Sequence, residues 1–216
     1  MNQPANILVT GSSRGLGPGI AVKLAAAGHS VAIHYANNRA AAEETAAACA
    51  QSASNSAQKF PVVGGNVGLA SDRERLMVET LTTFGRLDAL VNNAGIAPRV
   101  RADIIDAAED VFDEVIAVNL KGPYFLSQSA AKHWLANPGQ STIKGGYKLI
   151  FISSISANTA SINRGEYCIF KAGLGTAVSS WPSVSPRQAF RSSNSAGHHG
   201  DGYDRRREGK IRQASF

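Results

Sequence analysis

Short apolar runs alternate with helical patterns through most of this chain, and this alternation limits the folds that the chain can adopt. Five runs have the length and composition of buried strands, and they lie at residues 5–10, 30–35, 59–67, 87–95 and 147–154. Helical patterns separate these runs at residues 15–28, 39–53, 71–85 and 106–136, and a further helix opens near Gly165. Because strands that alternate with helices are joined by right-handed crossovers, the pattern predicts an α/β fold with a doubly wound parallel sheet, Rossmann-like in topology.

Composition and charge argue against several classes of protein. Hydrophobic residues make up 44% of the 216 residues, enough for a core, and the two cysteines suggest a reducing compartment rather than a disulfide framework. The first residues do not resemble a secretory signal, and no apolar stretch approaches the ~20 residues that cross a bilayer. The formal charge of +6 is concentrated after Ser180, where seven basic and three acidic residues lie. We therefore expect a cytoplasmic protein that binds neither membranes nor nucleic acid.

A glycine-rich turn, TGSSRGLG at residues 10–17, joins the first apolar run to the first helix. Gly11 allows a sharp turn, Gly15 lets the backbone approach a phosphate, and Gly17 permits close packing of the helix on the strand. The amino end of the helix offers free N–H groups and a partial positive charge to a pyrophosphate. The turn therefore predicts a dinucleotide site, and its candidate residues are Gly11, Ser13, Arg14, Gly15, Leu16 and Gly17.

The second apolar run bears on the choice of dinucleotide. It ends in HYANNR, without the Asp or Glu that usually holds the ribose diol of NAD(H). Arg14 and Arg39 lie near the expected place of a 2′-phosphate, and guanidinium groups suit bidentate phosphate contacts. We therefore expect NADP(H), with NAD(H) as the less favoured cofactor. The alternative for Arg39 is a solvated charge at the start of a helix.

Tyr167 and Lys171 are four residues apart on the last predicted helix, so both project from one face. An ammonium near a phenol favours the phenolate and lowers the phenol pKa from ~10 toward neutrality. Tyr167 would then be a usable general acid in reduction. Ser154 ends the preceding strand, and its hydroxyl could hydrogen-bond the same substrate oxygen. The alternative is that the pair merely forms one face of an amphipathic helix.

Together these motifs resemble the short-chain dehydrogenase/reductase family, and the resemblance covers residues 5 to about 180. TGSSRGLG, NNAG, VNLKGPYF around Asn119, FISSISA and YCIFK occur in the family's order, and Ser154 precedes Tyr167 by the family's usual interval of thirteen. Within the family, the chain looks most like the bacterial 3-oxoacyl-acyl-carrier-protein reductases and their NADPH-dependent relatives. The resemblance implies hydride transfer to a carbonyl, with no metal.

The resemblance also implies roles for individual residues. Tyr167 would protonate the carbonyl of a small-molecule or acyl-carrier-linked substrate, Ser154 would polarise it, and Lys171 would bind the nicotinamide ribose. Asn119 would support a water in the proton relay; taken without the family, its alternative role is a helix-interior residue satisfied by local backbone. The further cofactor-binding residues are Tyr35, Asn66, Val67, Asn93, Ala94 and Gly95, together with Tyr167 and Lys171.

Some features depart from the family pattern or go beyond the site. Asn66 stands where the family commonly has Asp, and Phe170 where Ser is frequent. Family members commonly form homo-oligomers through two long helices, which here correspond to residues 110–136 and 165–180. The resemblance therefore also implies a possible homo-oligomer.

The stretch after Ser180 does not follow the family. Pro182 and Pro186 should end the last helix early, and residues 191–216 have almost no aliphatic side chains with which to fill a sheet position. The family's PG loop, substrate lid and last strands do not appear. We therefore expect a catalytic domain over residues 1–180 and an irregular basic tail over residues 181–216.

A frameshift is the hypothesis that explains this tail. Codons can be chosen so that a shifted frame of residues 196–216 encodes PGIMATDMTAGVKERYDRLA, and another frame of residues 181–195 encodes AVRLAEAGIPVFEF. These strings restore the missing loop, lid, helix end and strand. The alternative is a genuine basic arm, with Arg205–Arg207 on phosphates or His198 and His199 on a metal. Either origin leaves a second possibility for function, an inactive or weakly active cofactor-binding fragment.

Overall fold

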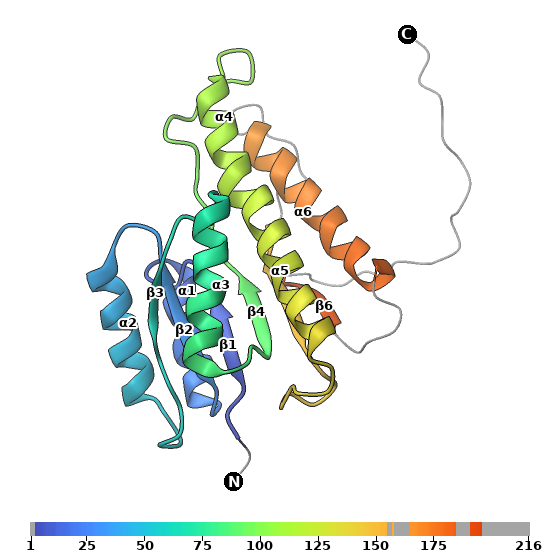
Figure 1. Ribbon diagram of the computed structural model, residues 1–216. Coiled ribbons are helices and arrows are strands. Elements are labelled where there is room, and N and C mark those ends of the chain that lie inside the picture. Colours follow the sequence, from blue (N-terminus) through green and yellow to red (C-terminus); the bar gives the residue numbers. More distant parts are fainter. Residues whose placement is uncertain (1–2, 155–156, 158–164, 185–190, 196–216) are drawn as a thin grey trace, which may run out of the picture.

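Six parallel strands form the centre of the computed structural model, which describes residues 3–154, 157, 165–184 and 191–195 (Figure 1). The strands are β1 (Asn6–Val9), β2 (Ser30–Tyr35), β3 (Val62–Gly64), β4 (Ala89–Asn92), β5 (Lys148–Ile152) and β6 (Arg191–Ser195). The helices are α1 (Leu16–Ala26), α2 (Arg39–Gln51), α3 (Ala70–Phe84), α4 (Glu109–Ile116), η1 (Ala117–Lys121), α5 (Gly122–Ala136) and α6 (Gly165–Val184). The strand order β3-β2-β1-β4-β5-β6 confirms the predicted doubly wound sheet.

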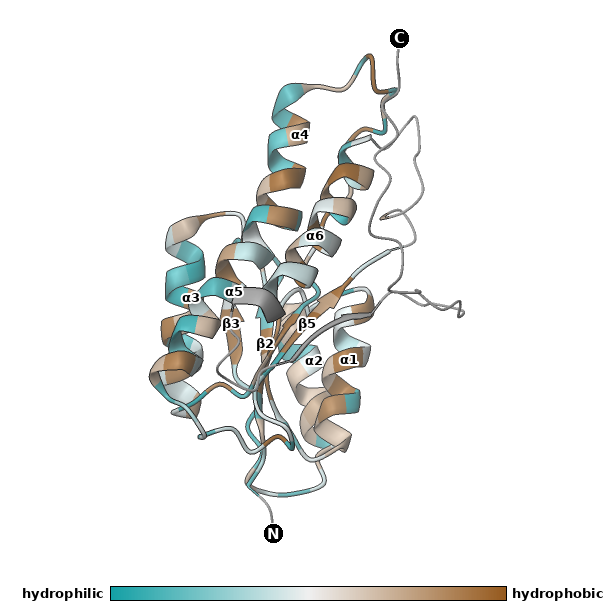
Figure 2. Ribbon diagram, turned by 90° about the vertical axis from the view of Figure 1, so that its right-hand side faces the viewer, coloured by the Kyte–Doolittle hydropathy of each residue, from teal (hydrophilic) through white to brown (hydrophobic). Residues whose placement is uncertain are grey.

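The two faces of the sheet carry separate hydrophobic cores, because successive side chains of a strand point to opposite faces. Ile7 and Val9 of β1 pack in the core that includes α1 and α2, whereas Leu8 belongs to the core that includes α3, α5 and α6. Figure 2 shows α1 and α2 on one side of the apolar strands, with α3 and α5 on the other. The strands are therefore buried on both faces, which explains their continuous apolar runs.

The long helical region expected at residues 106–136 is interrupted in its middle. α4 passes into η1, a π-helical turn, where the N–H of Gly122 donates to the carbonyl of Ala117 five residues earlier. Pro123, in the first turn of α5, has no N–H with which to continue the α-helical pattern. The π-helical turn contains Asn119, one of the predicted site residues.

The stretch after Ser180 differs from the prediction. α6 runs to Val184 and includes Pro182, and β6 pairs in parallel with β5 from Lys148↔Arg191 onward. The prediction that this stretch cannot occupy a sheet position is therefore wrong, and the helix ends at Val184, four residues beyond Ser180. A single proline removes only one hydrogen bond of the helix, and a strand pairs through backbone groups that every non-proline residue carries.

Several predictions about the tail fall on residues that the structure does not describe. Residues 185–190 and 196–216 lie outside the described part of the chain, and with them Pro186, His198, His199 and Arg205–Arg207. The segment whose shifted frame would restore the family's loop and lid also lies there. The origin of the tail therefore stays a prediction.

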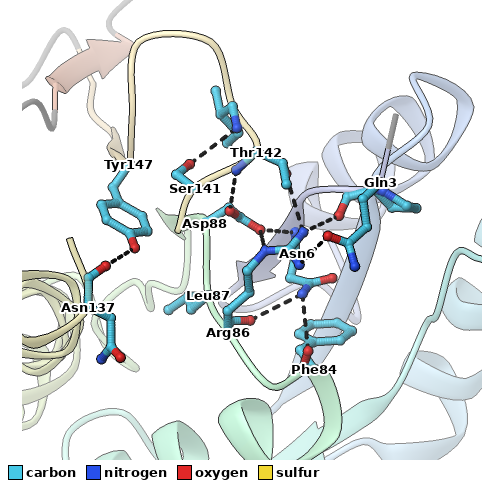
Figure 3. Close-up of polar contacts among 12 residues, drawn as sticks. Gln3, Asn6, Phe84, Arg86, Leu87, Asp88, Asn137, Ser141, Thr142 and Tyr147 are labelled. Carbon is cyan, nitrogen blue, oxygen red and sulfur yellow. Dashed lines mark hydrogen bonds and ion pairs between the residues drawn. The ribbon is translucent and has the colours of Figure 1, made fainter. Parts of the chain in front are cut away.

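A buried carboxylate joins three segments at the amino ends of the strands, on the edge of the sheet opposite the glycine turn (Figure 3). Asp88 is fully buried, and its Oδ2 accepts from the Asn6 N–H at 2.7 Å and from Arg86 Nε at 3.0 Å. Its Oδ1 accepts from the Thr142 N–H at 2.9 Å. Arg86 also donates to the Pro4 carbonyl at 2.7 Å. One carboxylate therefore ties the start of β1 to the loop before β5.

Asp88→Asn should lower the free energy of unfolding by about 2 kcal/mol, because hydrogen bonds to a charged group contribute ~1.5–3 kcal/mol and an amide cannot replace the charge. Urea denaturation at neutral pH measures the loss. Asp110→Asn is the matched control, since the Asp110 side chain is 75% exposed and lies 3.7 Å from Arg99. That variant should change stability by less than about 1 kcal/mol. Equal losses in the two variants would contradict a special role for Asp88.

Candidate active site

The glycine-rich turn follows β1 at the carboxyl edge of the sheet, and two of its glycines leave no room for a side chain. Gly11 has φ of 63°, and a Cβ there would lie 2.7 Å from the Cα of Ala94. A Cβ on Gly17 would lie 2.2 Å from the Gly11 carbonyl oxygen. Gly15 has φ of 68°, and a Cβ on it would meet nothing within 4 Å. The turn is therefore packed closely against the protein at Gly11 and Gly17, whereas the space beside Gly15 is free of other atoms of the described residues.

The amino end of α1 fits a pyrophosphate. Its N-cap residue is Gly15, and neither a side-chain cap nor an acidic residue occupies the first turn in the described part of the chain. The first N–H groups of a helix have no partner within the helix, so an uncapped end favours an anion. Ser13 is half-buried beside this end, whereas Arg14 and Leu16 are exposed. The structure therefore brings the predicted phosphate-binding residues to this end of α1, and their contact with a phosphate stays a prediction.

The NNAG turn after β4 is bound to the glycine-rich turn. Thr10 Oγ1 accepts from the N–H groups of Asn93 and Ala94, each at 3.0 Å. Asn93 Nδ2 donates to the carbonyls of Thr10 at 2.9 Å and Gly11 at 3.0 Å. Motifs that are 80 residues apart thus form one unit at the point where the strand order reverses. Thr10 was not among the predicted site residues, although its position at the start of the motif was a usable signal.

The residues predicted to select the cofactor lie in different surroundings. Arg39 is exposed and pairs with Glu43 at 2.8 Å, and this contact, with Tyr35 nearby, raises the pKa of its guanidinium. Asn66 is exposed, and its Oδ1 accepts from the Gly68 N–H at 2.9 Å. Val67 is buried in the core of the α3 face. The Val67 side chain therefore packs inside the protein, and only its backbone could face a ligand.

Tyr167 and Lys171 occupy neighbouring turns of α6. Lys171 Nζ lies 5.8 Å from the centroid of the Tyr167 ring and 5.1 Å from that of Phe170, and it donates to the Ile152 carbonyl at 2.8 Å. Ile152 is the last residue of β5, and Ser154 follows two residues later. The predicted helix pair is thus anchored beside the strand end that carries Ser154. Phe170, the position that departs from the family pattern, packs its ring edge-on against Tyr167 at 4.7 Å.

Asn119 is buried and acts across the fold rather than along its own helix. Its Oδ1 accepts from the Ile96 N–H at 2.7 Å, and its Nδ2 donates to the Ile96 carbonyl at 2.8 Å. A Cβ on Gly95 would lie 3.0 Å from the same Oδ1. The structure therefore contradicts the alternative of an Asn satisfied by local backbone. The side chain fixes the segment after NNAG, and its role in a proton relay stays a prediction.

A cavity of about 220 Å³ lies between the segment before α4, α4 itself and the first turn of α6. Val100, Val111 and Phe112 give it an apolar lining, and Asp106 and Glu166 add two carboxyl groups. Glu166 directly precedes Tyr167 in α6. The cavity is therefore close in sequence to the candidate acid, and sequence reasoning did not identify its residues.

The described residues offer neither a metal site nor a membrane span. No group of three or more His, Cys, Asp or Glu residues there could hold a metal ion. Among the same residues, no helix has both the length and the apolar character needed to cross a membrane.

The open parallel sheet carries a glycine turn at its switch point and a Tyr–Lys pair at the same edge, an arrangement suited to a dinucleotide. The family model described as short chain dehydrogenase matches residues 5–182. The chain therefore belongs to the short-chain dehydrogenase/reductase family, and the resemblance predicted from its motifs is confirmed.

The curated relatives include reductases that are named for different substrates. Tetrahydroxynaphthalene reductase of Pyricularia oryzae is 32% identical over 155 residues, which are 72% of this chain and 50% of the relative. The 3-oxoacyl-[acyl-carrier-protein] reductase FabG of Staphylococcus aureus is 32% identical over 175 residues, which are 81% of this chain and 65% of the relative. The chain thus spans between half and two thirds of the length of these curated relatives.

Solved structures of similar fold contain either cofactor. The landomycin C-6 ketoreductase LanV with bound NADP has a TM-score of 0.76 and 28% identity, and the match covers 89% of this chain and 76% of LanV. A 3-oxoacyl-[acyl-carrier protein] reductase from Brucella melitensis in complex with NAD has a TM-score of 0.74 and 31% identity, with 85% and 69% covered. This chain therefore belongs to a group that binds NAD(P)(H).

Burial lowers the pKa of Lys171 from 10.5 to about 8, because the ammonium loses solvation. Between these two values the unfolded chain holds a proton that the folded chain has released, so the free energy of unfolding rises with pH in this window. Lys171→Met should remove that rise. Without cofactor, the stability of the wild type relative to Lys171→Met should increase above about pH 8 and stay constant below it. Parallel urea-denaturation profiles across this window would contradict the prediction.

Proposed function

We propose that this protein is an NADPH-dependent reductase that converts the carbonyl of a 3-oxoacyl-type substrate to a hydroxyl. The observation that carries the proposal is the placement of Tyr167 and Lys171 beside the end of β5, with Lys171 bound to the Ile152 carbonyl. The glycine turn lies at the same carboxyl edge of the sheet, where ligands of such folds bind. A small-molecule ketone or an acyl-carrier-linked thioester could present its carbonyl to this edge.

The proposed roles follow from the chemistry of the side chains. A reduced nicotinamide bound at this edge would supply the hydride for the carbonyl carbon. Tyr167 gives its hydroxyl proton to the carbonyl oxygen as negative charge develops there, and Ser154 donates a hydrogen bond to the same oxygen. Lys171 places a positive charge near the Tyr167 ring and holds the ribose hydroxyls. Asn119 holds the segment at Ile96, which steadies the wall of the site.

NADPH is the proposed cofactor, with NADH as the weaker alternative. The support is the absence of an acidic residue at the end of β2, where the sequence reads HYANNR, and the nearby guanidinium groups of Arg14 and Arg39. Arg39 would have to give up or share its pair with Glu43 to reach a 2′-phosphate. Arg14 forms no ion pair within the described part of the chain and is the better candidate.

Oxidation of NADPH in the presence of an acetoacetyl thioester tests the proposal, with a simple ketone and NADH run in parallel. We expect turnover that depends on the carbonyl compound and is faster with NADPH than with NADH. Binding of NADPH without turnover of any carbonyl would support the second candidate, a cofactor-binding fragment. That candidate is favoured by one observation, the partial coverage of the curated relatives. The same assay on a frame-restored chain separates a lost activity from one that never existed.

The assembly and the compartment are also proposals. α5 exposes Tyr124, Phe125 and Leu135, and α6 exposes Ile169, so these two helices offer apolar surface for a homo-oligomer. Light scattering of the purified chain would give its mass in solution. Cys49 and Cys168 are free thiols, which suits a reducing compartment such as the cytoplasm.

A further inference from the structure

A histidine is buried at the carboxyl end of β2, directly behind the glycine-rich turn. His34 is 1% exposed and directly follows the three apolar residues 31–33 of β2. A buried imidazole is costly unless both ring nitrogens have partners. Its partners therefore show what the residue does.

Both ring nitrogens of His34 are bound to backbone. The Gly11 N–H donates to Nδ1 at 2.9 Å, and Nε2 lies 2.8 Å from the Gly65 carbonyl oxygen. An N–H can only donate and a carbonyl can only accept, so Nδ1 carries no proton and Nε2 carries one. The surroundings thus select a single neutral tautomer.

The backbone of His34 is tied to the same turn. The Ser12 N–H donates to the His34 carbonyl at 2.9 Å, and the His34 N–H donates to Ser12 Oγ at 2.8 Å. Ser12 is fully buried, and its hydroxyl donates a hydrogen bond to the Val9 carbonyl at 2.8 Å. Three hydrogen bonds therefore join His34 to Gly11 and Ser12, and a fourth joins it to the loop after β3.

We propose that His34 is a positioning residue for the dinucleotide: its ring holds Gly11 in the conformation that aims the turn at the pyrophosphate, and it fixes the Gly65 loop that presents Asn66. The inference rests on the cofactor site proposed above. Glycine is free to adopt many backbone conformations, so a contact such as the bond from the Gly11 N–H to the His34 ring helps to select the positive φ seen here; Gly65 directly precedes Asn66. One side chain thus coordinates two separate segments of the cofactor edge.

The charge state of His34 agrees with this role. Burial lowers its pKa to about 4, against the opposing effects of the Gly65 carbonyl and of Asp72 on α3. If Nδ1 were protonated, its N–H would face the Gly11 N–H, and two donors would meet without an acceptor. The neutral ring is therefore the form present near neutral pH.

Three substitutions separate the two arms of the ring. Asn has an acceptor at the position of Nδ1, Gln has a polar group at the reach of Nε2, and Leu has neither. By fluorescence titration with NADPH, His34→Leu should weaken binding about tenfold or more, the cost of an orphaned buried N–H. His34→Asn should recover most of the affinity, and His34→Gln should recover less. Unchanged affinity in His34→Leu, or equal rescue by Asn and Gln, would overturn the proposal.

Val31→Ala controls for a general loss of stability, because Val31 is a fully buried core residue of the same strand. It should lower the free energy of unfolding and leave NADPH affinity nearly unchanged; an equal loss of affinity would overturn the proposal. Hydrogen exchange at the Gly11 amide of the cofactor-free protein is the second readout. It should speed up in His34→Leu and not in His34→Asn, and unchanged exchange in His34→Leu would overturn the proposal. If the wild type binds no nucleotide, the proposed function fails, and the exchange rates still decide whether His34 holds the turn.

Discussion

Replacement of Tyr167 by Phe should lower kcat for carbonyl reduction by about 10²–10⁴-fold, the usual contribution of a positioned general acid. Phe retains the ring that packs at 4.7 Å against Phe170 and lies 5.8 Å from Lys171 Nζ, and it lacks only the hydroxyl group. The substrate KM and the affinity for NADPH should therefore change little, because the loss falls on the transition state. Steady-state oxidation of NADPH and a fluorescence titration measure the two quantities.

Tyr124→Phe is the matched control for this experiment. Tyr124 lies on α5, 44% exposed, and loses the same hydroxyl on substitution. It should retain full activity. A Tyr167→Phe protein whose rate stayed within about threefold of the wild type would remove Tyr167 from the role of acid, since even weak general acids contribute more. A loss of NADPH binding in that variant would point to a structural role instead.

Gly17→Ala should weaken NADPH binding by about 10- to 100-fold, because displacement of the turn would cost one or two of its hydrogen bonds to the pyrophosphate, at about 1.5 kcal/mol each. The added Cβ would lie 2.2 Å from the Gly11 carbonyl oxygen and 2.6 Å from the Cα of Ser12, so the turn itself must move. That carbonyl also accepts from Asn93, and the movement would disturb the contact between the two turns. Equilibrium titration with NADPH measures the loss.

Gly19→Ala is the control for Gly17→Ala, because both glycines lie in α1. A Cβ on Gly19 would meet nothing within 4 Å. The alanine should leave NADPH affinity unchanged and stabilise the helix by up to about 1 kcal/mol. Similar affinities in the two variants would show that the turn tolerates displacement, contrary to the geometry of the site.

The architecture was predictable because its signals are local. Each buried strand is a short apolar run, α1 and α3 end near Gly28 and Gly85, and alternation of strands and helices leaves one class of fold. The π-helical turn at Ala117–Lys121 was not predictable from periodicity, since it arises from the hydrogen bond between Gly122 and Ala117 beside Pro123. β6 was missed because its pairing with β5 depends on backbone groups, which carry no sequence signal.

The candidate site was predictable where the spacing of residues in a motif determines their local geometry. The crowding at Gly11 and Gly17 was expected from the spacing of the glycines, and the Tyr–Lys pair from helical periodicity. The partners of His34 were not predictable, because Gly65 and Gly11 reach it only through the order of the strands. The burial of the Val67 side chain was not predictable either, since a motif does not show which face of the backbone meets the ligand.

The frameshift hypothesis concerns the gene rather than the fold, so the decisive observation is the coding DNA. Codons that cannot yield the alternative readings of residues 181–216 would refute it. If they can, the frame-restored chain is the proper subject for a substrate screen. The chain as written then remains the reference for cofactor binding, since the glycine turn and its supports all lie before residue 120.

The long-range pairing of β1 has a consequence for synthesis on the ribosome. β1 lies between β2 and β4, so its second edge stays unpaired until β4, which places Ala89 opposite Ile7, has been synthesised. The hydrogen bonds from the Asn93 side chain to the carbonyls of Thr10 and Gly11 can form only after that. Closing loops of this length is slow, so nascent chains shorter than this should expose one edge of the central strand to chaperones. The capacity to bind nucleotide should therefore appear abruptly during translation, once β4 and its following turn have left the exit tunnel.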